Sequence, residues 1–294
     1  KEDVVITPAF GTTVEIENLL RQKGVQTETY NTTCPFVEKV WKRSREIGER
    51  GYTVIIHGKV AHEETRATFS HTLQNAPSVI VRNMKEVQKL AEFFSGKAPA
   101  SEFFTAFAGK YSPGFDPEKD LSRVGVVNQT TMLASETQEI ADYVRSQMMS
   151  IYGDNWSEHF ADTRDTLCYA TNDNQDATAA VLESSADLAI VVGGYNSSNT
   201  IQILTILSGG MPSFFIRGAD NIISAESISH YDVAAQAEKL SPWMGSGKPR
   251  IVITSGASCP DRVVDEVIRR VADVIPGSLS PEEVIESFFE TQNT

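Results

Sequence analysis

The chain has 294 residues, which is long enough to bury a sizeable core in one large domain or in two or three smaller ones. Its net charge of −13 argues against binding to nucleic acid, because affinity for the phosphate backbone depends on clustered Lys and Arg. No apolar run approaches the roughly 18 residues of a membrane span, and no signal peptide is visible. We therefore expect a protein that binds neither nucleic acid nor membrane.

Short strands alternate with helices along the chain. Strands are predicted over 4–7, 27–31, 52–56, 78–81, 124–127, 188–192, 213–216 and 251–254, and helices over 35–50, 135–150 and 260–274. The range 96–123 is rich in glycine and proline and is predicted to be an insertion or a long loop. Strands separated by crossover helices predict an α/β protein with parallel sheets, whose ligands bind beyond the carboxyl ends of the strands. No internal sequence repeat is visible.

Polar clusters follow directly on most of these strands, and we expect them to form one shared site. They occupy 8–11, 32–35, 57–64, 128–131, 193–199 and 255–258. The cluster 193–199 joins two glycines to hydroxyl and amide side chains before a helix, which suits a phosphate group but equally suits an ordinary capped turn. The turn 255–258 has a similar design, and two such turns suit a diphosphate. Neither matches a nucleotide-binding glycine loop.

The remaining chemistry lies in one histidine–carboxylate pair and three cysteines. His62 and Glu64 do not fit a zinc-binding pattern, so Glu64 is interpreted either as a proton donor or as a solvated acid at a helix start. Cys34 and Cys259 each precede a proline that opens a helix, a position that favours a thiolate. With Cys168 they form a candidate metal-binding trio, or each is a small buried apolar residue. The absence of a C-x-x-C pair favours a reducing compartment over secreted disulfides.

Six of these segments, taken in order, resemble the signatures of the LytB/IspH family of 4-hydroxy-3-methylbut-2-enyl diphosphate reductases. They are Thr33-Cys34-Pro35, the Gly58 to Thr65 segment, Asn128-Gln129-Thr130-Thr131, Cys168-Tyr169-Ala170-Thr171, the Gly193 to Thr200 segment and Ser255-Gly256-Ala257-Ser258. The resemblance runs from Pro8 to about Val274 and is strongest to the cyanobacterial and plastid branch.

The resemblance implies a trefoil of three α/β domains with mainly parallel sheets around a central iron–sulfur site. We expect 1–34 to be the remnant of the first domain, 35–165 the second with its insertion near 96–123, 166–274 the third, and 275–294 a C-terminal tail. A [4Fe-4S] cluster held by three cysteines would leave one iron open for substrate. By resemblance Cys34 and Cys168 are ligands, the third ligand lies upstream of Lys1, and Cys259 is not a ligand.

The resemblance also assigns the substrate site. His62, Ser197, Ser198, Asn199 and Ser258 would hold the diphosphate substrate. Glu64 would deliver protons, and Thr130 would position Glu64 or the substrate hydroxyl. One histidine of the family pattern is expected upstream of Lys1, and Phe10 stands in place of another.

The implied reaction is a reductive dehydroxylation of 4-hydroxy-3-methylbut-2-enyl diphosphate to isopentenyl and dimethylallyl diphosphate, the last step of the methylerythritol phosphate pathway. Electrons would come from ferredoxin or flavodoxin, in the bacterial cytoplasm or alternatively in the plastid stroma. Two other interpretations stay open from the residues. One is a non-catalytic phosphate-binding α/β module, and the other is a metal-free sugar-phosphate isomerase that uses His62 and Glu64.

Overall fold

The computed structural model of the protein describes residues 4–162, 169–245 and 247–292. The chain divides into two compact units, Lys1–Cys168 and Tyr169–Thr294, each of which has its own sheet and core. The finer domain boundaries expected at 34 and 274 stay a prediction. Among the described residues, no helix combines the length and the apolar character that crossing a membrane requires.

A four-stranded parallel sheet forms the centre of the N-terminal unit and confirms the predicted α/β class. Its strand order is β2-β1-β3-β4, and the strands are β1 (Thr53–His57), β2 (Ser78–Val81), β3 (Val124–Asn128) and β4 (Phe160–Ala161). Every residue of these strands is buried. Continuous burial explains why the strands lack an alternating polar face, as expected for a parallel sheet covered on both sides.

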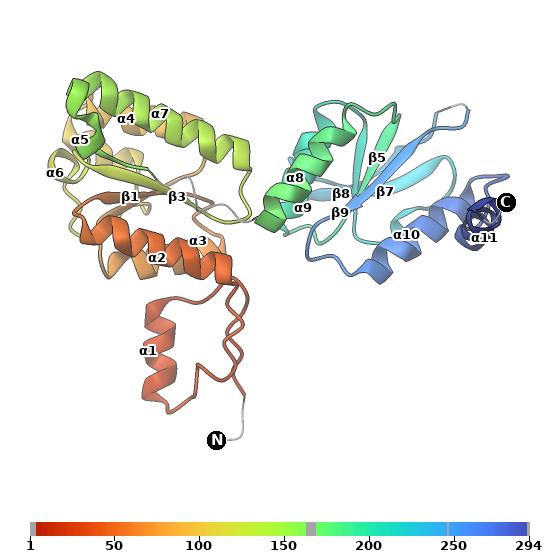
Figure 1. Ribbon diagram of the computed structural model, residues 1–294, viewed down its shortest axis with the longest axis horizontal. Helices are drawn as coiled ribbons and strands as arrows, with labels where there is room; N and C mark the ends of the chain where they lie inside the picture. The colour runs from red at the N-terminus through yellow and green to blue at the C-terminus, as the bar shows by residue number, and fades with distance from the viewer. Residues whose placement is uncertain (1–3, 163–168, 246, 293–294) are drawn as a thin grey trace. The chain divides into compact units, whose positions relative to one another are not determined.

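Helices cover both faces of this sheet (Figure 1). One face packs against α2 (Pro35–Glu49) and α3 (Glu63–Leu73), and the other against α4 (Met84–Phe94) and α7 (Ala134–Tyr152), which is followed by a 3-10 helix at Gly153–Glu158. Successive side chains of β1 point to opposite faces, so Val54 and Ile56 join the core beneath α2 while Ile55 joins the core beneath α4 and α7.

The range 96–123 contributes buried side chains to the core, and its interpretation as a long loop was wrong, while its status as an insertion stays a prediction. It contains two short helices, α5 (Ala100–Ala106) and α6 (Pro117–Asp120). Phe103 is fully buried and stacks on Phe107 and Phe115, with ring centroids 5.1 and 4.9 Å apart. The glycines and prolines mark turns between these short helices, while the aromatic side chains supply the burial that orders the segment.

The predicted strands 4–7 and 27–31 are reduced to one parallel bridge between Thr7 and Asn31. The helix between them, α1 (Val14–Gln22), buries none of its residues, and the side chains of Val4 and Ile6 are more than half exposed. Strand-like sequence without a covered apolar face gives too little burial to extend the pairing beyond a single bridge.

The C-terminal unit repeats the same design with three parallel strands in the order β6-β5-β9. These strands are β5 (Leu188–Val192), β6 (Ser213–Ile216) and β9 (Ile251–Ser255), and the helices are α8 (Tyr169–Val181), α9 (Ser198–Ser208), α10 (Asp261–Val274) and α11 (Pro281–Gln292), with a 3-10 turn at Ala219–Asn221. In β5, Ile190 belongs to the core that contains α10, and Val191 to the core that contains α9.

An antiparallel hairpin in this unit was missed by the sequence patterns. It pairs β7 (Ser227–Asp232) with β8 (Ala237–Pro242), and almost all residues of β8 are exposed. Tyr231 of the hairpin stacks on Tyr195 with ring centroids 4.3 Å apart. Strands this polar lack the apolar alternation by which a strand is recognised.

We predict that His57 makes the stability of the protein depend on pH. Its ring is fully buried at the end of β1, with Nδ1 2.9 Å from Thr137 Oγ1 and Nε2 3.8 Å from Glu136 Oε2. Burial lowers the pKa of His57 from 6.5 to about 4. The unfolded chain therefore binds more protons between those values, so the free energy of unfolding should fall by about 3 kcal/mol as the pH falls through this range.

The measurement is chemical denaturation of the wild type and of His57→Asn between pH 7 and pH 4. Carboxylates that titrate over the same range are common to both proteins, so their effect cancels in the comparison. The wild type should lose more stability than the variant on acidification. Parallel curves would show that the histidine carries none of the pH dependence.

Candidate functional site

One candidate site, in the N-terminal unit, lies at the carboxyl ends of β1 and β3. These strands are neighbours, with His57 in register with Asn128, so the loops that follow them meet at one edge of the sheet. The structure thereby brings together three residues singled out in the sequence, His62, Glu64 and Thr130. It adds Gln129, for which the sequence indicated no individual role.

Glu64 is a buried carboxylic acid in the first turn of α3. Its side chain is 2% exposed, and its Oε1 accepts a 2.5 Å hydrogen bond from the backbone N–H of Thr130. Burial raises the pKa of Glu64 to about 7, against the opposing effect of the hydrogen bonds from Thr130. Desolvation therefore wins, and near neutral pH this group can both hold and release a proton.

His62 caps the same helix and is oriented by that contact. Its Nδ1 accepts a 3.2 Å hydrogen bond from the backbone N–H of Glu64, so the proton of the neutral ring is on Nε2. Burial and the nearby Lys59 ammonium lower the pKa of His62. The ring therefore presents one N–H donor, which suits an acceptor such as a phosphate oxygen.

Cys34 is the cysteine of the N-terminal unit that lies in a described region. It is the N-cap residue of α2, directly before Pro35, and its backbone N–H donates to the carbonyl of Ala9 at 2.8 Å. Its thiol is free and partly exposed. Phe10, next to Ala9, is 39% exposed. Cys168 lies outside the described residues.

A separate candidate site belongs to the C-terminal unit, in the turn between β5 and α9. Ser197 caps α9 by accepting the Thr200 N–H at 3.3 Å. Ser198 and Asn199 are 4% and 6% exposed, yet the Ser198 hydroxyl and both amide atoms of Asn199 have no hydrogen-bond partner within the described part of the chain. Buried polar groups are nearly always paired, so these three atoms make the α9 N-terminus a candidate ligand site.

Two glycines let this helix start approach the sheet. A Cβ at Gly193 would lie 2.7 Å from Thr200 Oγ1, and a Cβ at Gly256 would overlap the same hydroxyl. Ser258 lies in the turn that Gly256 opens, and its side chain is exposed. The N-terminal unit uses the same contact, because a Cβ at Gly58 would lie 2.5 Å from Thr65 Oγ1 in the first turn of α3.

Cys259 has the surroundings of a structural residue. It packs against the apolar core that contains β5 and α10. Burial, and to a smaller extent the negative charge of Asp261, raises the pKa of its thiol. A raised thiol pKa disfavours the thiolate that metal binding needs. Within the described residues, no three His, Cys, Asp or Glu side chains are grouped closely enough to hold a metal ion.

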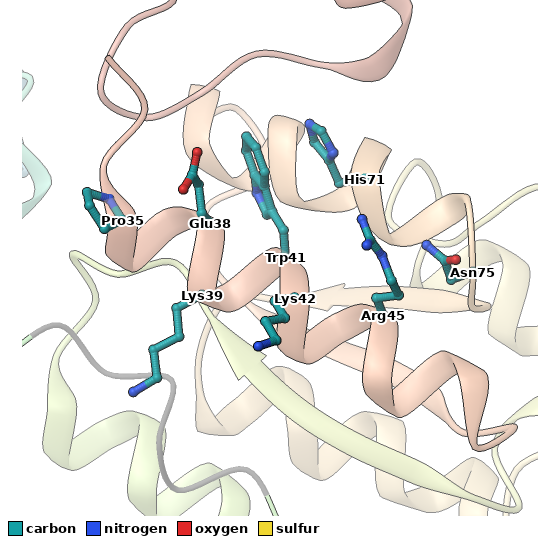
Figure 2. Close-up of a pocket in the computed structure, with 8 residues that line it drawn as sticks. All are labelled: Pro35, Glu38, Lys39, Trp41, Lys42, Arg45, His71 and Asn75. Carbon is teal, nitrogen blue, oxygen red and sulfur yellow. The ribbon is translucent and has the colours of Figure 1, made fainter. Parts of the chain in front are cut away.

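A separate open cavity of about 550 Å³ lies along α2 and α3 (Figure 2). Trp41 stacks on His71 beside it, with ring centroids 3.7 Å apart, and Lys39 and Lys42 point away from that pair. Neither His62 nor Glu64 lines this cavity. The His71 ring is held by the carbonyl of Thr12 at 3.1 Å, so the pair serves to attach the N-terminal segment.

We predict that Gly256→Ala destabilises the C-terminal unit by about 1–3 kcal/mol, because the added Cβ overlaps the Thr200 hydroxyl and overpacks the helix start. Gly245→Ala is the matched control, since a Cβ there meets no atom within 4 Å. Urea denaturation of both variants measures the difference. Equal stability of the two variants would mean that the close approach of α9 to β9 imposes no constraint.

The comparisons with known proteins agree on one family. A model of the LytB protein family matches residues 1–272. The 4-hydroxy-3-methylbut-2-enyl diphosphate reductase of Synechococcus sp. (strain RCC307) is 42% identical over 271 residues, which cover 92% of this chain and 65% of that protein. The enzyme of the same name from Gloeobacter violaceus (strain ATCC 29082 / PCC 7421) is 40% identical over 277 residues, with 93% and 65% covered. The chain thus spans less than two-thirds of the length of these two relatives.

Solved structures show the same fold. The E-1-hydroxy-2-methyl-but-2-enyl-4-diphosphate reductase from Plasmodium falciparum matches with a TM-score of 0.64 at 18% identity, over 98% of this chain and 78% of that one. A structure of (E)-4-hydroxy-3-methyl-but-2-enyl diphosphate reductase matches with a TM-score of 0.50 at 22% identity, over 92% and 76%. From the family match and the cyanobacterial relatives together, the chain belongs to the LytB protein family.

Proposed function

We propose that the protein is a 4-hydroxy-3-methylbut-2-enyl diphosphate reductase, which removes the substrate hydroxyl by adding two electrons and two protons and releases water with isopentenyl or dimethylallyl diphosphate. The observation that carries the proposal is the buried carboxyl group of Glu64 in a member of the LytB family. Its pKa of about 7 lets it donate a proton at neutral pH. The names of the cyanobacterial relatives support the same activity.

In this proposal the C-terminal unit binds the diphosphate. The unpaired Ser198 hydroxyl and Asn199 amide would donate to phosphate oxygens, helped by the N–H groups and dipole of the α9 N-terminus. Ser197 stays engaged as the helix cap and would add a hydroxyl at the edge of the site, as would the exposed Ser258. In the N-terminal unit, the Nε2–H of His62 would be a further donor to the substrate.

Glu64 and Thr130 would handle the proton. The Thr130 N–H holds Glu64 Oε1, which leaves the other carboxyl oxygen to carry the proton toward the departing hydroxyl. Protonation lets the hydroxyl leave as water. Because the protonated form of Glu64 is populated below pH 7 or so, this step should slow as the pH rises above that value.

The residues also fit an iron–sulfur cluster, which we propose as the cofactor, in the form [4Fe-4S]. Cys34 has a free, partly exposed thiol at the N-terminus of α2, and Cys168 would be a second ligand. When bound, a cluster with one open iron supplies both electrons and a Lewis acid for the substrate oxygen. The apolar packing of Cys259 supports leaving it out of the ligand set.

The electron donor in this proposal is ferredoxin or flavodoxin. The matched relatives come from cyanobacteria, which supports a site of action in the bacterial cytoplasm, with the plastid stroma as the alternative.

The proposed function predicts that Glu64→Gln lowers turnover by about 10²–10⁴-fold while substrate still binds, because the amide keeps the shape of the side chain but cannot donate the proton. Glu63→Gln is the matched control. Glu63 is exposed and pairs with Arg66 at 3.0 Å on the surface of the same helix turn. Anaerobic reduction assays with a chemical one-electron donor measure both. Near-wild-type turnover in Glu64→Gln would remove Glu64 from the reaction, and a colourless, inactive protein would favour the phosphate-binding module.

The cofactor assignment predicts different outcomes for the cysteines in the full-length protein. Cys34→Ser and Cys168→Ser should lose or destabilise bound iron, whereas Cys259→Ser should keep both iron and activity because its thiol packs in an apolar core. The measurement is iron per protein after anaerobic reconstitution, together with visible absorbance. Equal loss of iron on changing Cys259 would identify it as a ligand and contradict this assignment.

A further inference from the structure

Gln129 is fully buried, and its side-chain amide connects three separate segments of the N-terminal unit. Its Oε1 accepts hydrogen bonds from the backbone N–H of Lys59 at 3.1 Å and from the Thr65 hydroxyl at 2.9 Å. Its Nε2 donates to the Thr131 hydroxyl at 2.6 Å. One amide therefore joins the loop after β1, the first turn of α3 and the loop after β3.

These contacts fix which way round the amide lies. The Lys59 N–H can only donate, so the atom that faces it must be the oxygen, and the two accepted hydrogen bonds occupy both lone pairs of that oxygen. The backbone of Gln129 is also held, because its N–H donates to the His57 carbonyl at 2.8 Å. Main chain and side chain together leave this residue little freedom.

The Gln129 contacts lie on both sides of Glu64. Thr65 follows Glu64 directly in α3, and Thr130 follows Gln129 directly in the loop after β3. The hydrogen bond from the Thr130 N–H to Glu64 Oε1 therefore spans two segments that the Gln129 amide already ties together. Without that amide, nothing in this hydrogen-bond set would hold the first turn of α3 at the distance the Glu64 contact requires.

We propose that Gln129 is a positioning residue, whose amide holds the first turn of α3 against the loop after β3 and so keeps the Glu64 carboxyl on the Thr130 N–H. The consequence for turnover rests on the proposed function, in which Glu64 donates a proton. The geometric role does not, because it concerns only where the carboxyl of Glu64 lies.

The test is Gln129→Met, which keeps the length of the side chain and removes its hydrogen bonds. The Thr130 N–H lowers the pKa of Glu64, so loosening that contact should raise this pKa above its value of about 7, by about one unit. The titration is followed by the infrared absorbance of the protonated carboxyl group, assigned by its loss in Glu64→Gln. In the holoenzyme, the pH above which kcat declines should move upward by the same amount, with KM little changed.

Matched variants separate positioning from a general loss of stability. Thr72→Val removes a buried hydroxyl from the same helix, where it donates to the Thr68 carbonyl at 2.7 Å, and should leave the Glu64 titration unchanged. Thr65→Val removes one partner of the Gln129 oxygen and should raise the pKa of Glu64, whereas Thr65→Ser keeps the hydroxyl and should not.

An unchanged Glu64 titration in folded Gln129→Met would overturn the proposal, and so would an equal shift in Thr72→Val. If Gln129→Met does not fold, the comparison of Thr65→Val with Thr65→Ser decides: a shift in the first alone supports the proposal, and identical titrations overturn it. A shifted titration with turnover that is independent of Glu64 would uphold the positioning role and remove the proposed function instead.

Discussion

The contact between a glycine after a buried strand and a threonine in the first turn of the next helix determines how this protein presents its polar side chains. It occurs between Gly58 and Thr65 in one unit and between Gly193 and Thr200 in the other. Without a Cβ on the glycine, the helix start comes close to the sheet edge, and the side chain before the threonine is buried. That side chain is Glu64 in the first unit and Asn199 in the second.

The two helix starts differ in their electrostatics because the buried side chains differ. A carboxyl group is expensive to desolvate as an anion, so burial raises the pKa of Glu64 despite its position at a helix N-terminus, where the dipole favours negative charge. The neutral amide of Asn199 has no such response and stays a hydrogen-bond donor and acceptor at every pH near neutrality. One helix start therefore holds a carboxyl group whose charge changes near neutral pH, and the other holds an amide that stays neutral.

Hydrogen bonds at these sites divide the polar residues into two groups. Gln129 uses both lone pairs of its oxygen and one N–H within the protein, so it is committed to holding its neighbours. Ser198 and Asn199 are also buried, but the Ser198 hydroxyl and the Asn199 amide atoms have no partner among the described residues. This contrast is a physical basis for separating residues that support the site from residues that are available to a substrate.

The sequence by itself determined the parallel α/β class, because buried strands and crossover helices leave a clear apolar pattern, and it identified the motifs that carry family membership. It could not show that 96–123 joins the core or that a polar hairpin forms at 227–242. The packing of Phe103 on Phe107 and Phe115, and of Tyr231 on Tyr195, leaves no periodic apolar pattern in the sequence. From the residues alone, before the resemblance entered, the favoured interpretation of Glu64 was a solvated acid at a helix start. Only the tertiary structure decided that Glu64 is buried. Gly58 follows β1, whereas Gln129 and Thr130 follow β3, and these two strands are far apart in the chain but adjacent in the sheet.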